Sequence, residues 1–221
     1  MQVDILVMAP DFLRIIWCAA RTCYSARTPQ ELWSKPPERE EMLRLARKIL
    51  SSGHWSVVEH CTVTFAVAGV SRALLAQYSR HRIGVSLSVQ SQRFVSERSD
   101  YNQGLFDAVV PPSVAGRPEA LALYREELQR AQKAYDALTS LGIPKEDARF
   151  VLPNAAATNF VTTLNLRSLL DIYHKRVATP GAQWEIRRLV RRMAELVLER
   201  EPWLAEFFPP AAPEGTEAVQ E

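Results

Sequence analysis

Residues 77–93 form a dense group of hydrogen-bonding side chains. Three arginines, one histidine and several serine and glutamine residues share these seventeen positions. Arginine binds phosphate or carboxylate through charge-assisted hydrogen bonds, and neutral hydroxyl and amide groups can bind the edges of a base. The segment is therefore a candidate site for a small anionic ligand. A salt-bridged surface turn is the alternative that the spacing alone leaves open.

The positions of the glycines exclude two common ways of binding a phosphate. The eight glycines are too far apart to form GxGxxG or GxxxxGK[ST], the loops of Rossmann and P-loop proteins. Side chains and helix ends must therefore hold any nucleotide that this protein binds.

A metal site is another possibility that the residue types raise. His54, Glu59 and His60 lie close together in HWSVVEH, but their spacing differs from the HExxH of zinc enzymes, and no cysteine joins them in ligand spacing. We predict no metal site. The alternative for this block is a polar helix start capped by Ser56.

Four blocks of sequence resemble the flavin-dependent thymidylate synthases. RHRIGVSLSVQSQRF, residues 80–94, is similar to the family signature, which is Arg-His-Arg followed after about seven residues by Ser-x-Arg. The other blocks occur in the family's order. They are HWSVVEH (54–60), ARFVLP (148–153), and NLRSL with AQWEIR (165–169 and 182–187). The resemblance covers about residues 1–208.

The sequence departs from the family pattern at a few positions. Eight residues separate Arg82 from Ser91, one more than the common spacing. Valines occupy 57–58, where the first block usually has a proline before its glutamate. Phe94 replaces a usual tyrosine, and Asp171 replaces a common asparagine.

The resemblance implies an activity and its cofactors. Members of this family convert dUMP to dTMP with methylenetetrahydrofolate as the carbon donor and FAD as the hydride carrier, which NADPH reduces. The resemblance makes Arg176 the catalytic residue. Arginine stays protonated, so it cannot act as a base, but it can stabilise negative charge that develops on the uracil ring.

The resemblance also implies the residues of two binding sites. Those expected to bind dUMP are Gln77, Tyr78, Ser79, Arg80, Gln90, Ser91, Gln92, Arg93, Arg149 and Arg176. Those expected to bind FAD are Ser56, Arg80, His81, Arg82, Asn165, Leu166, Arg167 and Asp171.

Simpler interpretations of the same residues stay open. Arg167 could form a helical i,i+4 ion pair with Asp171. The arginines at 187–192 are interpreted as the solvated face of a helix, because apolar residues occupy its other side. For the whole chain, the alternatives are a non-catalytic nucleotide- or RNA-binding protein that uses segment 80–93, and a flavin oxidoreductase of other specificity.

The composition is that of an ordinary globular protein. Of 221 residues, 47% are hydrophobic and 24% charged, and the net charge of +2 is too small to indicate nucleic-acid binding. No apolar run is long enough to span a membrane. Cys18, Cys23 and Cys61 form no CxxC motif, which favours a reducing compartment, and we expect a cytoplasmic protein without a cysteine nucleophile.

The pattern along the chain predicts an α+β fold in a single domain over 1–208, with a small antiparallel sheet flanked by long helices. A strand is expected at 3–8 and another at 61–70. The helices are expected near 11–23, 38–53, 71–80, 118–141, 164–177 and 183–200. Whether 83–95 is a strand or an ordered loop stays open. The tail at 209–221 is predicted to be disordered.

The resemblance further implies a homotetramer with shared active sites. Ser91 and Arg93 of one chain are expected to face Arg176 of another around one dUMP. The long helix at 118–141 separates these segments along the chain, so an interface between chains would bring them together more easily.

Overall fold

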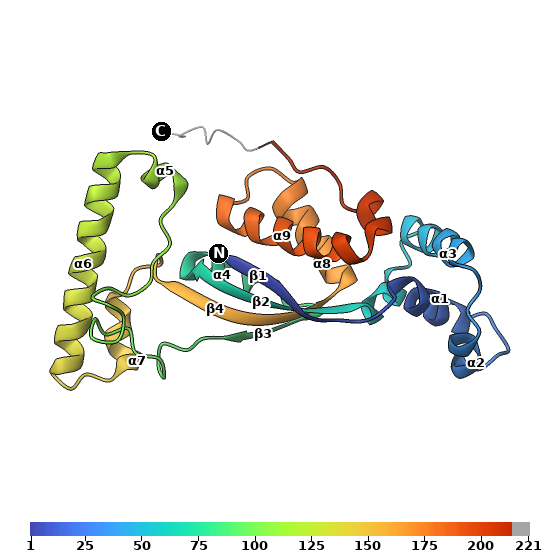
Figure 1. Cartoon of the computed structure of the whole chain (residues 1–221), viewed down its shortest axis with the longest axis horizontal. Coiled ribbons are helices and arrows are strands. Elements are labelled where there is room, and N and C mark those ends of the chain that lie inside the picture. The colour runs from blue at the N-terminus through green and yellow to red at the C-terminus, as the bar shows by residue number, and fades with distance from the viewer. Residues whose placement is uncertain (214–221) are drawn as a thin grey trace. The chain divides into compact units, whose positions relative to one another are not determined.

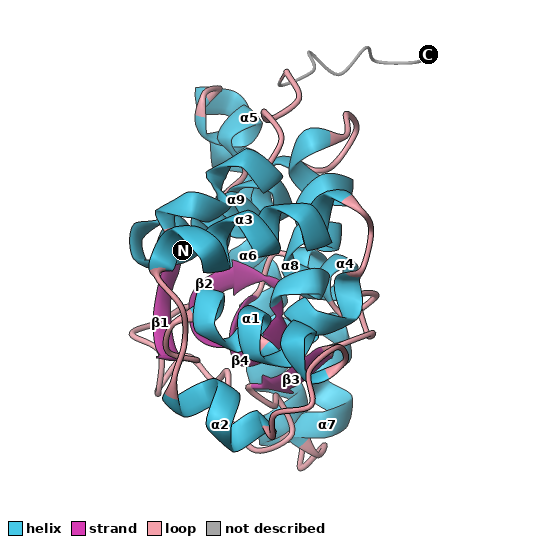
Figure 2. Cartoon of the chain, turned by 90° about the vertical axis from the view of Figure 1, so that its right-hand side faces the viewer, coloured by secondary structure: helices cyan, strands magenta, loops and turns pink. Residues whose placement is uncertain are grey.

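The computed structural model describes residues 1–213 and contains one four-stranded sheet. Its strands are β1 (Gln2–Met8), β2 (Thr62–Ser71), β3 (Val85–Val89) and β4 (Ala157–Asn165), drawn in magenta in Figure 2. They are hydrogen-bonded in the order β1-β2-β4-β3, and the sheet is antiparallel. The predicted α+β class with a small antiparallel sheet is confirmed.

Helices make up most of the remaining structure (Figure 1). The α-helices are α1 (Phe12–Thr22), α2 (Pro29–Ser34), α3 (Arg39–Ser51), α4 (Arg72–Tyr78), α5 (Pro112–Ala115), α6 (Pro118–Ser140), α7 (Lys145–Ala148), α8 (Leu166–Tyr173) and α9 (Trp184–Arg200). Short 3-10 turns are η1 (Trp55–His60), η2 (Arg149–Val151) and η4 (Pro202–Phe207), and η3 (His174–Ala178) is a π-helical turn.

The chain forms two compact units and passes between them several times. The first unit contains residues 1–2, 67–80 and 88–160, and the second contains 3–66, 81–87 and 161 onward. Every strand contributes residues to both units. The candidate dUMP residues other than Arg176 therefore belong to the first unit, and the candidate FAD residues other than Arg80 belong to the second.

The core of the first unit lies against α6. Phe106, Leu128 and Ala156 are buried together, and Tyr124 packs against them and donates its hydroxyl to the carbonyl of Val109 at 2.7 Å. Buried Gln132 accepts from the backbone of Phe106, so this polar side chain is satisfied. The apolar residues of α6 recur every three or four positions and form its packing face.

The second unit is built from two groups of helices. In the first, α1 packs against α2 and α3, and Asp11 caps α1 by accepting from the backbone of Arg14. In the second, α8 packs against α9, where Ile186, Leu189 and Val190 are fully buried.

Several expectations need correction or completion. Strand β4 and helix α2 have no counterpart among the predicted elements, and 83–95 resolves into β3 followed by a turn. Arg187 does not lie on a solvated face: it is 5% exposed and donates to the carbonyls of Ala212 and Pro213. The tail predicted to be disordered therefore has hydrogen-bonded residues at 212–213, and its remainder, 214–221, lies outside the described residues. Within residues 1–213, no helix is both long and apolar enough to cross a membrane.

Candidate functional site

Two of the predicted phosphate-binding arginines meet at the turn that contains α7 in the first unit. Arg93 Nε pairs with the carboxylate of Glu146 at 2.6 Å, and Arg149 Nε donates to the backbone carbonyl of Glu146 at 3.0 Å. Ser91 Oγ accepts from the backbone of Arg93 and so fixes the turn after β3. Arginines from two distant segments thus gather at one place, where an anion could replace the Glu146 carboxylate as partner of Arg93.

Arg72 belongs to the same region, although sequence reasoning missed it. It starts α4, and its Nη2 donates to the carbonyl of Gln90 at 3.1 Å. Its buried Nε has no hydrogen-bond partner within residues 1–213. Burial lowers the pKa of Arg72, the nearby charge of Arg149 lowers it further, and Glu97 acts against both. Two neighbouring arginine charges make this surface favourable for an anion.

The remaining dUMP candidates in this unit divide into exposed and buried side chains. Ser79, Arg80 and Gln90 are exposed, and Gln90 Oε1 accepts from Asn159 at 2.9 Å. Tyr78 is fully buried and stacks on Phe160 with 5.2 Å between ring centroids, so its side chain belongs to the core.

Gln77 and Gln92 complete the candidates of the first unit. Gln77 lies in the last turn of α4 and is half-buried. Gln92 is 6% exposed and lies beside Glu97, whose carboxyl pKa is raised by burial. Little of the Gln92 side chain therefore faces solvent, and its contact with Glu97 stabilises the turn after β3.

In the second unit, the start of α8 and the loop before β3 fit closely together. Asn165 caps α8 by accepting from the backbone of Ser168 at 2.9 Å, and Ser168 Oγ donates to the carbonyl of Ile83 at 2.8 Å. Gly84 has φ +65°, and a Cβ there would lie 2.5 Å from Ser168 Oγ and 2.6 Å from Asn165 Nδ2. Only glycine allows this approach, which holds Arg82 beside the start of α8.

Arg167 and Asp171 lie on α8 but do not pair with each other. Arg167 Nη1 pairs with Glu59 at 2.5 Å, and Asp171 pairs with Lys175 at 2.8 Å. The helical Arg167–Asp171 pair considered above is therefore wrong, because a partner from η1 competes for the guanidinium. Leu166 is fully buried and contributes its backbone to the β4–α8 junction.

Arg176, the candidate catalytic residue, lies in the π-helical turn η3. Its Nε donates to Nε2 of His81 at 3.0 Å. A ring nitrogen that accepts this bond carries no proton, so the geometry requires a neutral His81 with its proton on Nδ1. π-Helical turns often occur at functional sites, and here the turn directs a cation toward the Arg-His-Arg segment.

The HWSVVEH block forms η1 and does not assemble a metal centre. Glu59 is paired with Arg167, and within residues 1–213 no group of three or more His, Cys, Asp or Glu side chains gathers as metal ligands. The cap by Ser56 given above as an alternative is not formed. His54 occupies the cap position of η1, without a side-chain hydrogen bond.

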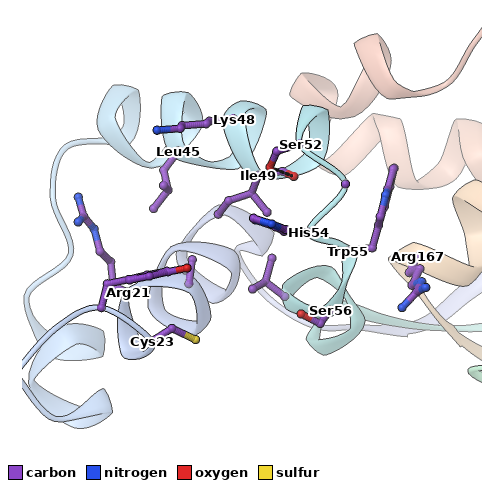
Figure 3. Close-up of a pocket in the computed structure, with 14 residues that line it drawn as sticks. Arg21, Cys23, Leu45, Lys48, Ile49, Ser52, His54, Trp55, Ser56 and Arg167 are labelled. Carbon is purple, nitrogen blue, oxygen red and sulfur yellow. Dashed lines mark hydrogen bonds between the residues drawn. The ribbon is translucent and has the colours of Figure 1, made fainter.

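A cavity of about 790 Å³ adjoins two of the candidate FAD residues in the second unit (Figure 3). Ser56 and Arg167 contribute to its wall. The rest of the wall comes from the end of α1, from α3, from η1 and from the loops that follow α1 and α3, and it includes Arg21, Lys48 and Trp55.

The three cysteines differ in their surroundings. Cys61 is buried, and burial together with the charge of Glu201 raises the pKa of its thiol, which keeps it protonated. Cys18 is half-buried and Cys23 is exposed.

Comparison with known proteins decides the family. The model of the family described as "Thymidylate synthase complementing protein" matches residues 4–203. A flavin-dependent thymidylate synthase of Geobacter sulfurreducens is 41% identical over 197 residues, covering 89% of this chain and 82% of the relative. The chain belongs to the flavin-dependent thymidylate synthase family.

A second relative and two solved structures agree with this assignment. The flavin-dependent thymidylate synthase of Nitratidesulfovibrio vulgaris is 38% identical, covering 92% of this chain and 84% of the relative. A UMP/dUMP methylase from Streptomyces cacaoi, solved with 5-Br dUMP, has a TM-score of 0.78 at 20% identity and covers 96% of this chain and 97% of its own. The Helicobacter pylori flavin-dependent thymidylate synthase, solved with FAD and dUMP, has a TM-score of 0.72 at 21% identity and covers 95% and 100%. These structures confirm that the fold is the family's.

Proposed function

We propose that this protein is a flavin-dependent thymidylate synthase that methylates dUMP to dTMP, with FAD as its cofactor and methylenetetrahydrofolate and NADPH as co-substrates. The observation that carries the proposal is the 41% identity to a flavin-dependent thymidylate synthase over most of both chains. The gathering of Arg93 and Arg149 at one turn, and the bond between Arg176 and His81, support it from the geometry.

The first unit supplies a binding surface for the nucleotide monophosphate. Arg93 and Arg149 would bind the phosphate by charge-assisted hydrogen bonds, and the exposed carboxylate of Glu146 would release Arg93 to the substrate. Arg72 adds a half-buried guanidinium beside them. Gln90 and Ser91 are polar groups of the size and type that bind a base or sugar.

The residues of the second unit fit a flavin dinucleotide. Arg82 is exposed and forms no ion pair within the described part of the chain, which leaves it able to bind a diphosphate. The close fit at Gly84 fixes Arg82 relative to Asn165. Further hydrogen bonds to the flavin would come from Ser56, His81, Arg167 and Asp171. Arg80 is a further candidate contact. When bound, FAD supplies the hydride chemistry, which amino-acid side chains lack.

Arg176 would act on the substrate ring. Negative charge develops on the uracil ring as its C5 carbon becomes nucleophilic, and a guanidinium that faces this charge lowers the barrier. Neutral His81 holds the Arg176 guanidinium through Nε without offsetting its positive charge. His81 therefore helps to orient the Arg176 guanidinium toward the substrate ring.

The absorbance spectrum of the purified protein tests the proposal. We expect flavin bands that bleach when NADPH is added without oxygen, and dTMP as product once dUMP and methylenetetrahydrofolate follow. A protein that stays colourless under flavin-replete conditions and binds RNA with a steep salt dependence would contradict it in favour of a binding protein. Flavin bands that bleach without any dTMP would indicate an oxidoreductase of other specificity.

We further propose a homotetramer in the cytoplasm. The free cysteines of the described structure support a reducing compartment. The resemblance to the family supports the tetramer, in which Ser91 and Arg93 of one chain would face Arg176 of another.

A further inference from the structure

The last described residues, 208–213, form a C-terminal strap across η3, the turn that contains the candidate catalytic arginine. Figure 1 shows this strap in red, where the chain leaves η4. Phe208 packs edge-on against Tyr173, which directly precedes η3, with 4.9 Å between ring centroids. The backbone N–H of Ala212 donates to the carbonyl of Val177 at 2.9 Å. The strap therefore contacts the chain both before and after the candidate catalytic residue.

The sequence of the strap suits it to hold the end of η3. Three of its six residues are prolines, which have a fixed φ and no N–H, so the strap loses less conformational entropy when it is ordered. The last carbonyls of a helix have no partner within the helix. Ala212 satisfies the carbonyl of Val177, the second-last residue of η3.

Arg187 fastens the strap to α9, the helix that packs on η3. Its side chain is buried, and its Nη1 donates to the carbonyl of Pro213 at 3.2 Å while its Nη2 donates to the carbonyl of Ala212. Within residues 1–213 no carboxylate pairs with this guanidinium, and its buried Nε has no hydrogen-bond partner. The strap thus supplies the two acceptors that this buried cation uses.

A buried guanidinium bound by carbonyls is a poor source of stability. Removing a charge from water costs free energy, and an apolar side chain in such a position often stabilises a protein as well. A guanidinium is superior where two acceptors must be held at fixed places, because its donors form a rigid plane. Arg187 therefore fits a residue that fixes one conformation of the strap.

We propose that Arg187 is a positioning residue for catalysis: it fastens the C-terminal strap, and the strap holds η3 so that Arg176 faces the substrate ring. The proposal rests on the function proposed above. The Arg176 side chain is bound by His81, and the backbone beside it is bound by Ala212. A group that stabilises developing charge must be placed accurately, since a displacement of about 1 Å can cost about 100-fold in rate.

Hydrogen exchange of the FAD-loaded protein tests the contact without turnover. In Arg187→Ala, peptides that cover 174–179 and 208–213 should exchange faster, because the bond between them loses its support. A peptide from α1 should be unchanged. Arg188→Ala is the matched control, since it removes an exposed arginine from the next position of α9, and all its peptides should match the wild type. Unchanged exchange at 174–179 and 208–213 in Arg187→Ala would overturn the proposal.

Single-turnover rates at saturating dUMP test the positioning role. We expect Arg187→Ala to lower kcat about tenfold while FAD stays bound. Arg187→Lys should recover part of this loss, because its ammonium can still bind a carbonyl. Combined with Arg176→Ala, the same substitution should cost nothing further, since it acts through Arg176. An equal loss from Arg187→Ala in both backgrounds would indicate general damage and overturn the proposal.

Two proline variants test the strap without touching α9, so they keep the test open if Arg187→Ala does not fold. Ala212→Pro removes the N–H that binds Val177 and should lower kcat as Arg187→Ala does. Ala211→Pro adds the same ring at an exposed neighbour, leaves that N–H in place and should keep the wild-type rate. Equal rates in the two variants would overturn the proposal. If exchange responds as expected but the wild type makes no dTMP, the proposed function fails and the fastening of the strap by Arg187 is confirmed.

Discussion

Arg176 and His81 are joined by a hydrogen bond of 3.0 Å from Nε to Nε2, between positions 95 residues apart in the sequence. The bond connects the π-helical turn η3 to the Arg-His-Arg segment of the family signature. Arg176 Nε donates this bond and His81 Nε2 accepts it. The candidate catalytic guanidinium is therefore positioned in part by the acceptor at residue 81.

This bond predicts a positioning role for His81. We expect His81→Ala, which removes the accepting nitrogen, to lower kcat more than His81→Gln, whose amide oxygen can still accept from Arg176 Nε. FAD content must be measured in parallel, since His81 is also a candidate flavin contact. Equal kcat values in the two variants, with FAD bound, would contradict the positioning role.

Removal of the Arg176 charge should slow the chemical step itself. Arg176→Ala is expected to reduce kcat at least about 100-fold while FAD remains bound, comparable to the loss of one oxyanion-stabilising donor. Arg176→Lys should recover little activity, because an ammonium cannot reproduce the planar guanidinium. Single-turnover kinetics with saturating dUMP measure this directly, and near-normal rates in either variant would show that Arg176 is not catalytic.

The close approach at Gly84 predicts a specific cost for a single methyl group. A Cβ at this position would collide with Ser168 and Asn165, so Gly84→Ala must both adopt a positive φ and displace the start of α8. We expect a loss of about 2–4 kcal/mol in the free energy of unfolding, with weaker FAD binding. Gly142→Ala is the matched control, since Gly142 also has a positive φ (+84°) but nothing within 4 Å of its Cβ position. Equal losses in the two variants, measured by urea unfolding, would show that the contact at Gly84 is unimportant.

The cysteines are expected to take no part in the reaction. Because burial raises the pKa of Cys61, its thiol remains protonated at neutral pH and should resist alkylation, whereas exposed Cys23 should react. The triple variant Cys18→Ser/Cys23→Ser/Cys61→Ala should retain dTMP formation. Mass spectrometry after iodoacetamide treatment checks the first expectation. Loss of turnover in a folded triple variant that still binds FAD and dUMP would indicate a cysteine nucleophile.

A shared active site can be tested by mixing subunits. Arg93→Ala and Arg176→Ala each remove one segment of the proposed site, so each parent enzyme should be inactive. If one dUMP is bound by Arg93 of one chain and Arg176 of another, a fraction of the sites in co-assembled hybrids contains both arginines and regains activity. Co-assembled hybrids that stay inactive, while both parents bind FAD, would rule out the shared site.

The sequence predicted the elements whose patterns are local. Helix α6 repeats its apolar residues every three or four positions and packs as expected, and Asp11 caps α1 through a neighbour three residues away. Helix α2 also carried a local signal that was overlooked, since Thr28 and Glu31 form a capping box. Alternation in ATNFVTTLN, residues 157–165, likewise indicated β4.

The sequence could not predict contacts that depend on distant segments. Arg167 had a plausible partner four residues away, but η1 places Glu59 beside it. The helical pattern indicated that Arg187 lies on a solvated face. In the fold, however, its guanidinium donates to the carbonyls of Ala212 and Pro213. Arg72 differs from a surface arginine only because Gln90 and Arg149 approach it in the fold. The motifs identified the candidate residues of the site, and the tertiary structure determined their partners.

One anaerobic turnover of the FAD-loaded enzyme tests directly whether this protein methylates dUMP. The protein is reduced with one equivalent of NADPH and is then mixed with dUMP and methylenetetrahydrofolate. The nucleotides are separated, and mass spectrometry identifies and quantifies them. We predict close to one molecule of dTMP for each flavin reduced. UMP is tested in a parallel reaction as a comparison substrate. Full reduction of the flavin followed by unchanged dUMP would contradict the assignment.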